Sequence, residues 1–115
     1  MRKRDRTILK KIIEEAAIIA QMTEGLKESD FLKNVEKQRA IVMTLINIGE
    51  LVKSLDSDFR IQHNQVPWKS IAGFRDVAAH GYFTLRMEEI WVYAIKDLPD
   101  VVGRLDELVA TDKKH

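Results

Sequence analysis

Three residues whose side chains handle phosphate groups and protons lie close together near position 80: Arg75, His80 and Tyr82. Histidine, with an ordinary pKa of about 6.5, exchanges protons at neutral pH. Arginine is permanently charged, and its planar fork matches phosphate oxygens as negative charge builds up in a transition state. RNA carries its own nucleophile, the ribose 2′-hydroxyl. This trio is therefore suited to cutting RNA without a metal and leaving a cyclic phosphate on the 5′ fragment.

The spacing of Arg75 and His80 sets a condition on that chemistry. Five positions of an ideal helix turn through roughly 500°, which leaves the two side chains roughly 140° apart. They can cooperate only if the helix ends at Gly81, or if a second subunit supplies the partner. The structural alternative is that the arginine caps helix carbonyls, the histidine completes a helix end and the tyrosine packs.

Composition excludes several other kinds of site. The chain has 115 residues and no cysteine, which predicts a single domain over residues 1–115 without disulfides, thiolate metal sites or a cysteine nucleophile. The sequence contains neither a Gly-rich phosphate loop nor a Gly-x-Ser-x-Gly elbow. Its three histidines, His63, His80 and His115, are far apart and have no carboxylate at ligand spacing. We therefore expect neither a metal nor a cofactor.

Charge and hydropathy narrow the possible partners. The net charge of +1 is too small for a protein that coats nucleic acid non-specifically. A basic cluster near the N-terminus could contact phosphate or form a frayed, solvated helix start; it comprises Arg2, Lys3, Arg4, Arg6, Lys10 and Lys11. The longest apolar run, residues 16–20, is far shorter than the roughly 20 residues that span a bilayer. No signal-type apolar core follows the basic start, so we expect a cytoplasmic protein without membrane contact.

Apolar residues recur at helical spacing along most of the chain, and no segment alternates as a strand would. A Ser or Asp before the second helix and Pro67 at the first position of the third give plausible starts. Gly81 suits a left-handed position after the third helix. The predicted helices are Arg4–Glu24, Ser29 or Asp30 to Leu55, Pro67 to His80, and a last one from about Leu85.

These helices predict an all-α, up-and-down bundle of four to five helices. The second helix has an apolar face wide enough to be central, yet Asn47 and Glu50 lie inside it beside Gly49. Those two polar residues either line a cleft or satisfy buried polar groups. Pro99 lies within the last helix and should kink it, or break it into two stacked helices, near Asp97–Pro99.

The stretch from Val66 to Phe83 closely resembles the signature of HepT-like HEPN domains, in which Arg, a polar residue, three mostly apolar positions, His, any residue and Tyr follow one another. Arg75, His80 and Tyr82 occupy the three defining positions. Asp76 stands where the family usually has Asn, and its charge could pair with Arg75. The segments 47–50 (Asn-Ile-Gly-Glu) and 97–99 (Asp-Leu-Pro) resemble two further family elements, so the resemblance covers most of the chain.

This resemblance implies a homodimeric ribonuclease toxin of a type VII toxin–antitoxin system, with the motifs of both subunits at a shared cleft. It also implies an antitoxin partner, an MntA-like minimal nucleotidyltransferase that transfers AMP from ATP to the motif tyrosine, here Tyr82. A bulky anionic adduct there would block the cleft and occupy Arg75.

The sequence therefore predicts a metal-independent endoribonuclease in which Arg75 contacts phosphate and His80 is the general acid or base. Tyr82 contacts substrate and receives the modification, and Asp76 orients Arg75 or His80. One alternative is a non-catalytic partner that presents nucleotide or substrate to the transferase. Another is a plain helical interaction protein whose motif only holds the dimer together.

Overall fold

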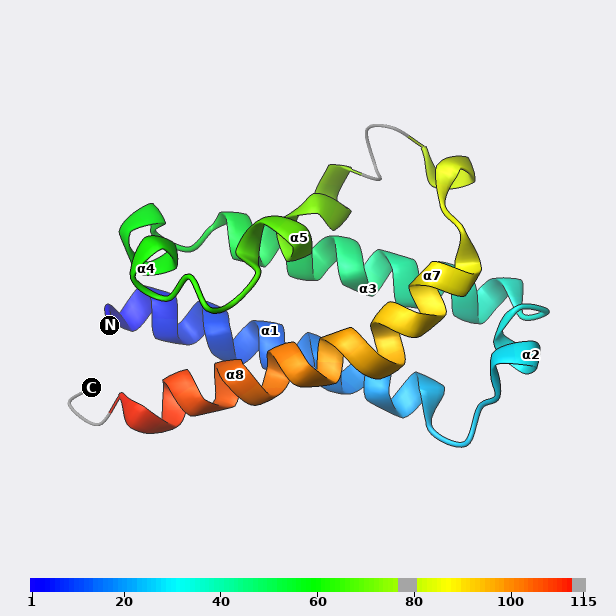
Figure 1. Cartoon of the computed structure of the whole chain (residues 1–115), viewed down its shortest axis with the longest axis horizontal. Helices are drawn as coiled ribbons and strands as arrows, with labels where there is room; N and C mark the ends of the chain where they lie inside the picture. The colour runs from blue at the N-terminus through cyan, green and yellow to red at the C-terminus, as the bar shows by residue number, and fades with distance from the viewer. Residues whose placement is uncertain (77–80, 113–115) are drawn as a thin grey trace.

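The chain folds into a bundle of helices, seen from the side in Figure 1. The computed structural model describes residues 1–76 and 81–112, and within these ranges it contains no strand. The predicted all-α bundle is thus confirmed. Its helices are α1 (Lys3–Thr23), α2 (Glu28–Phe31), α3 (Val35–Lys53), α4 (Ser57–Gln62), α5 (Trp68–Ala72), the 3₁₀ helices η1 (Gly73–Asp76) and η2 (Tyr82–Thr84), α7 (Met87–Val92), the π-helical segment η3 (Tyr93–Asp97) and α8 (Leu98–Thr111).

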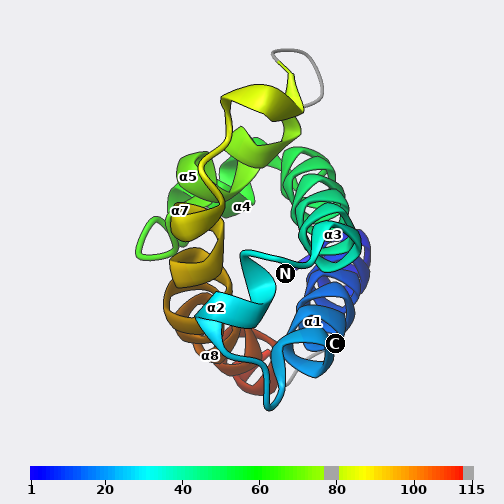
Figure 2. The ribbon, with the colours of Figure 1, turned by 90° about the vertical axis from the view of Figure 1, so that its right-hand side faces the viewer.

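The bundle has a single core of aliphatic and aromatic side chains. In the end-on view of Figure 2, α1 and α3 lie on one side of the bundle, and α5 and α7 lie on the other. Helix α1 packs against both α3 and α8, and α3 also carries α5 and η1. Because α3 contacts neighbours on two sides, its buried residues cover a wide face, as its sequence predicted. The apolar residues of α3 that are fully or almost fully buried are Ile41, Val42, Leu45, Ile48 and Val52.

Helix α3 begins later than the sequence predicted. The Asn34 side chain accepts a hydrogen bond of 3.0 Å from the backbone N–H of Lys37 and so caps α3. The predicted cap residues Ser29 and Asp30 belong instead to the separate short helix α2. The reason lies in tertiary packing: Phe31 at the end of α2 is fully buried, and its ring packs on the ring of Trp91 in the core. The single long second helix was therefore wrong at its start.

The third predicted helix is also irregular. Regular α-helix ends at Ala72, and the backbone continues as the 3₁₀ helix η1. Pro67 precedes α5 as its N-cap rather than occupying its first position. The predicted end at His80 lies outside the described residues. Gly81 has a φ of 96°, the positive value predicted for it, but its ψ of 134° lies outside the left-handed helical region.

Near Pro99, where the sequence predicted a kink or a break, the π-helical segment η3 directly precedes α8. The helical backbone runs without interruption from Met87 to Thr111, so there are not two stacked helices, and the start lies two residues after the predicted Leu85. Pro99 sits in the first turn of α8, where its missing N–H is tolerated. In the π-helical turns that precede it, backbone hydrogen bonds span five residues instead of the four of an α-helix.

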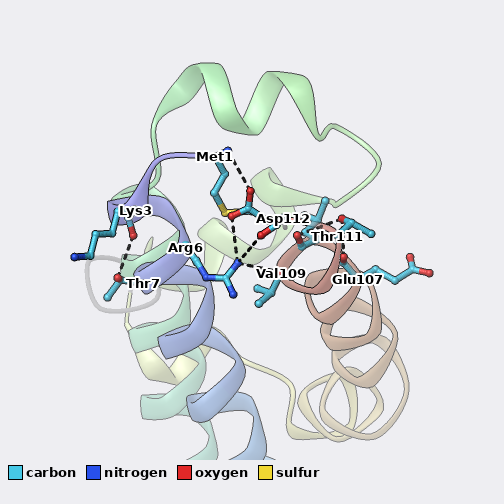
Figure 3. A network of polar contacts seen from close by, with 9 residues as sticks. Met1, Lys3, Arg6, Thr7, Glu107, Val109, Thr111 and Asp112 are labelled. Atoms are coloured by element: carbon cyan, nitrogen blue, oxygen red, sulfur yellow. Dashed lines mark hydrogen bonds and ion pairs between the residues drawn. The ribbon is translucent and has the colours of Figure 1, made fainter. Parts of the chain in front are cut away.

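The two ends of the described chain meet at one end of the bundle, and Arg6 joins them (Figure 3). Its guanidinium donates to the backbone carbonyl of Val109 at 3.1 Å and pairs with the Asp112 carboxylate at 3.2 Å. These contacts satisfy carbonyl groups at the end of α8 and place positive charge where the helix dipole favours it. Two other residues of the basic cluster, Arg2 and Arg4, pair with Asp56. Three arginines of the basic cluster thus have carboxylate partners, while Lys10 and Lys11 are exposed.

We expect Arg6→Met to lower the free energy of unfolding by about 1–2 kcal/mol, because it removes a charged hydrogen-bond donor from the end of α8 while keeping an unbranched side chain. Urea denaturation measures the change. Lys10→Met on the same helix is the control, since Lys10 is exposed. Equal stability of the two variants would show that the Arg6 contacts add nothing.

Candidate active site

Arg75 lies in η1, which packs against α3. Its Nε donates to Glu50 Oε1 at 2.8 Å, and the two side chains are 45% and 57% exposed. An ion pair this exposed adds little stability. It does orient the guanidinium, and within residues 1–76 and 81–112 the remaining N–H groups have no partner and can donate to an incoming phosphate.

Gly49 explains how η1 comes so close to α3. A Cβ at this position would lie 2.9 Å from the backbone nitrogen of Arg75 and 3.2 Å from the carbonyl oxygens of Ile71 and Ala72. Any side chain would therefore push η1 away from the helix. The Ile-Gly-Glu element of α3 therefore contributes to the position of Arg75 in two ways. Gly49 leaves room for the backbone that carries Arg75, and Glu50 orients the Arg75 side chain.

An aromatic pair also connects η1 to the π-helical segment η3. The ring of Phe74 meets that of Tyr93 edge to face, with 4.7 Å between centroids. The Tyr93 hydroxyl is buried and has no hydrogen-bond partner within the described residues. Burial, with a smaller contribution from the Asp97 carboxylate, raises the pKa of Tyr93 to about 12. The phenol therefore stays neutral, and Tyr93 serves η1 as a packing surface.

Tyr82 begins the short helix η2 and is half-buried against the core. Its hydroxyl contacts Met87 Sδ at 3.9 Å, a weak acceptor. The guanidinium carbon of Arg39 lies 5.1 Å from the centre of the Tyr82 ring, within cation–π range. Arg39 was not among the residues that the sequence singled out. An exposed arginine on a helix carries no local signal, so only the approach of η2 to α3 reveals it.

One face of α3 thus contacts both described ends of the motif. Arg39 and Glu50 are eleven positions apart, which turns an ideal helix through about 1100° and returns it to within about 20° of the same face. The rise between them is about 16 Å. Glu50 contacts Arg75 at one end of this stretch, and Arg39 contacts Tyr82 at the other.

The remaining predicted site residues are distributed as follows. His80 lies outside the described residues. Asp76 is exposed at the end of η1, and within the described residues the carboxylate that pairs with Arg75 is Glu50 rather than Asp76. Asn47 and Glu50 are both exposed, so neither satisfies a buried group. Asn47 donates to Glu15 Oε1 of α1 at 3.4 Å and thus contacts α1, whereas Glu50 contacts the motif.

Residues 12–108 match the protein family described as Ribonuclease HepT-like, and the chain belongs to this family. The prediction of a ribonuclease is confirmed by that membership. No solved structure matches the chain at a significant level. Within the described residues, no helix is both long and apolar enough to cross a membrane.

Relatives of similar length are named as ribonucleases. A candidate RNase of Caldanaerobacter subterraneus subsp. tengcongensis is 36% identical over 96% of this chain and 99% of its own length. A candidate RNase of Methanocaldococcus jannaschii is also 36% identical, over 95% of this chain and 91% of its own. A probable ribonuclease HepT of Thermococcus cleftensis is 30% identical, over 94% of this chain and 98% of its own.

Proposed function

We propose that this protein is an endoribonuclease that cuts RNA without a metal through Arg75 and His80. The observation that carries the proposal is the position of Arg75, whose half-exposed guanidinium is held in a fixed direction by Glu50 at the surface of the bundle. A fixed, solvent-accessible fork of donors is what a phosphodiester oxygen requires as charge accumulates on it.

In the proposed reaction the ribose 2′-oxygen attacks the adjacent phosphorus and loses its proton to a general base. The bond from phosphorus to the 5′-oxygen of the next nucleotide breaks, and that oxygen takes a proton from a general acid. The products are a 2′,3′-cyclic phosphate and a 5′-hydroxyl. His80 supplies one of the two proton transfers. In a homodimer with both motifs at one cleft, the second copy's histidine supplies the other.

Incubating the purified protein with RNA in excess EDTA tests this function. We expect cleavage by the unsubstituted protein and none by His80→Ala. Tight nucleotide binding without cleavage would instead favour a non-catalytic partner of a nucleotidyltransferase. Absence of both activities would favour a plain interaction protein, and either result would contradict the proposal.

We further propose that the protein is the toxin of a toxin–antitoxin pair, silenced when a minimal nucleotidyltransferase transfers AMP to Tyr82. The phenol oxygen would attack the α-phosphorus of ATP and lose its proton as pyrophosphate leaves. The Tyr82 hydroxyl suits this role because its described contact, Met87 Sδ, is weak and easily given up. An adenylyl group there would bring a negative charge beside Arg39, which already lies over the ring.

Mass spectrometry after incubation with an MntA-like minimal nucleotidyltransferase and ATP tests this assignment. We expect an AMP adduct on Tyr82, loss of cleavage in proportion to the adduct, and no adduct on Tyr82→Phe. Tyr93→Phe is the matched control, since the buried Tyr93 hydroxyl should not react. An adduct that persists in the Tyr82→Phe protein would show that another residue is the target.

A further inference from the structure

Phe83 presents an aromatic ring to solvent beside the motif. The residue is 93% exposed, and its ring lies edge-on to that of Tyr82 at 6.3 Å between centroids. Hydrogen bonds fix the turn that carries it: the Thr84 hydroxyl donates to the Gly81 carbonyl at 2.9 Å, and the Leu85 N–H donates to the Tyr82 carbonyl at 3.1 Å. Phe83 is therefore an uncovered ring on an ordered turn.

A cation lies next to this ring pair. Arg39 is exposed on α3 with its guanidinium over Tyr82, and it forms no ion pair with any carboxylate in residues 1–76 or 81–112. Arg75, by contrast, is paired with Glu50. The charge of Arg39 is thus available to an anion that reaches the Tyr82 ring, which also contacts the Phe83 ring.

We propose that Arg39, Tyr82 and Phe83 form a subsite for one unpaired nucleotide of RNA. The base stacks on the Phe83 ring, and a neighbouring phosphate contacts the Arg39 guanidinium. This inference rests on the proposed function for its substrate class. Stacking on an aromatic ring is open to every base, so the subsite binds without reading sequence.

The position of the subsite separates it from the bond that is cut. Along α3, Arg39 is about 16 Å from Glu50, the residue that holds Arg75. The nucleotide at the subsite is therefore a different one from the nucleotide whose phosphate Arg75 contacts, and the two contacts together fix the path of the RNA over the motif.

The chemistry also selects the form of RNA. In a duplex both faces of each base are covered by neighbouring bases, so a protein ring cannot stack on them. Loops, bulges and single strands expose those faces. The subsite should thus favour unpaired RNA, whereas Arg75 and Arg39 alone would attract the phosphates of either form.

Fluorescence anisotropy with a labelled RNA oligonucleotide, single-stranded or annealed to its complement, tests the subsite. His80→Ala is the parent protein, so that the RNA stays intact. We expect Phe83→Ala to weaken single-strand binding about tenfold, to leave duplex binding unchanged, and to be rescued by Phe83→Trp. Arg39→Ala should weaken binding and reduce its salt dependence by about one phosphate contact. Ile61→Ala, at a residue 70% exposed on α4, should change nothing.

Three results would overturn the subsite: single-strand binding by Phe83→Ala equal to that of the Ile61→Ala control, equal losses on single strand and duplex, or no RNA binding by the parent. A fourth is dissociation of a dimer by Phe83→Ala in sedimentation, which would assign the ring to a second copy of this chain. Cleavage by the unsubstituted protein is measured separately. If it cuts RNA but binding ignores Phe83, only the subsite fails; if Phe83-dependent binding persists without cutting, only the nuclease fails.

Discussion

Replacing Arg75 with alanine is expected to lower the rate of RNA cleavage by about a hundredfold or more. The guanidinium is the permanent positive charge that the motif holds at the bundle surface, and loss of one such group from a charged transition state has effects of this size. Thermal stability should hardly change, because the pair that Arg75 forms with Glu50 is largely exposed. Single-turnover cleavage of a defined oligonucleotide measures the rate, and thermal unfolding measures the stability.

Two further substitutions divide the effect of Arg75 into charge and geometry. Arg75→Lys keeps the charge but loses the planar fork, so we expect an intermediate rate. Glu50→Gln keeps the shape of the partner but loses its charge, so Arg75 should be less well oriented and the rate should fall by a smaller factor. A rate for Arg75→Ala within a fewfold of the unsubstituted protein would remove Arg75 from the catalytic step.

Gly49→Ala should combine the largest loss of stability with a loss of cleavage. The new methyl group would lie 2.9 Å from the backbone nitrogen of Arg75, and backbone cannot rotate away as a flexible side chain can. We expect the free energy of unfolding to fall by about 1–3 kcal/mol, as in overpacked cores. Cleavage should fall as well, because η1 moves off α3 and takes Arg75 away from Glu50.

Gly103→Ala provides a matched control for that substitution. Gly103 is likewise within a helix, α8, but a Cβ there would meet nothing within 4 Å. Alanine should therefore stabilise the protein by about 0.5–1 kcal/mol, since it removes the entropic cost of glycine in a helix. Urea denaturation and the cleavage assay on both variants check the pair. If Gly49→Ala behaved like Gly103→Ala in both measurements, the close approach of η1 to α3 would not matter.

The long helices could be predicted because each buries one face at a regular period. The apolar pairs of α1 and the wide apolar face of α3 are local patterns that the folded core simply uses. The start of α3 was harder, because Ser29, Asp30 and Asn34 are all good caps within six positions. Phe31 is buried in the core, which ends α2 and leaves Asn34 as the cap of α3. Whether one side chain is buried depends on the whole fold and cannot be inferred from its neighbours in the sequence.

The candidate site, too, could be predicted from the sequence only in part. The types and spacing of Arg75, His80 and Tyr82 are compatible with phosphodiester chemistry, and the resemblance to HepT-like domains turned that possibility into a prediction. The change from α-helix to 3₁₀ helix at Gly73 occurs where the chain packs closely on α3 at Gly49, which the sequence marks only as a glycine inside a helix. The pairing of Arg75 with Glu50 rather than its neighbour Asp76 depends on the same contact. Arg39 joins the site only through tertiary structure.

Analysis of the RNA ends left by the purified protein in excess EDTA tests the central claim most directly. Cleavage through the 2′-hydroxyl predicts 5′ fragments that end in a 2′,3′-cyclic phosphate, formed by the unsubstituted protein, about a hundredfold or more slowly by Arg75→Ala, and not by His80→Ala. Fragments that end in a 3′-hydroxyl, cleavage that stops when EDTA is added, or cleavage by either variant as fast as by the unsubstituted protein would contradict the account.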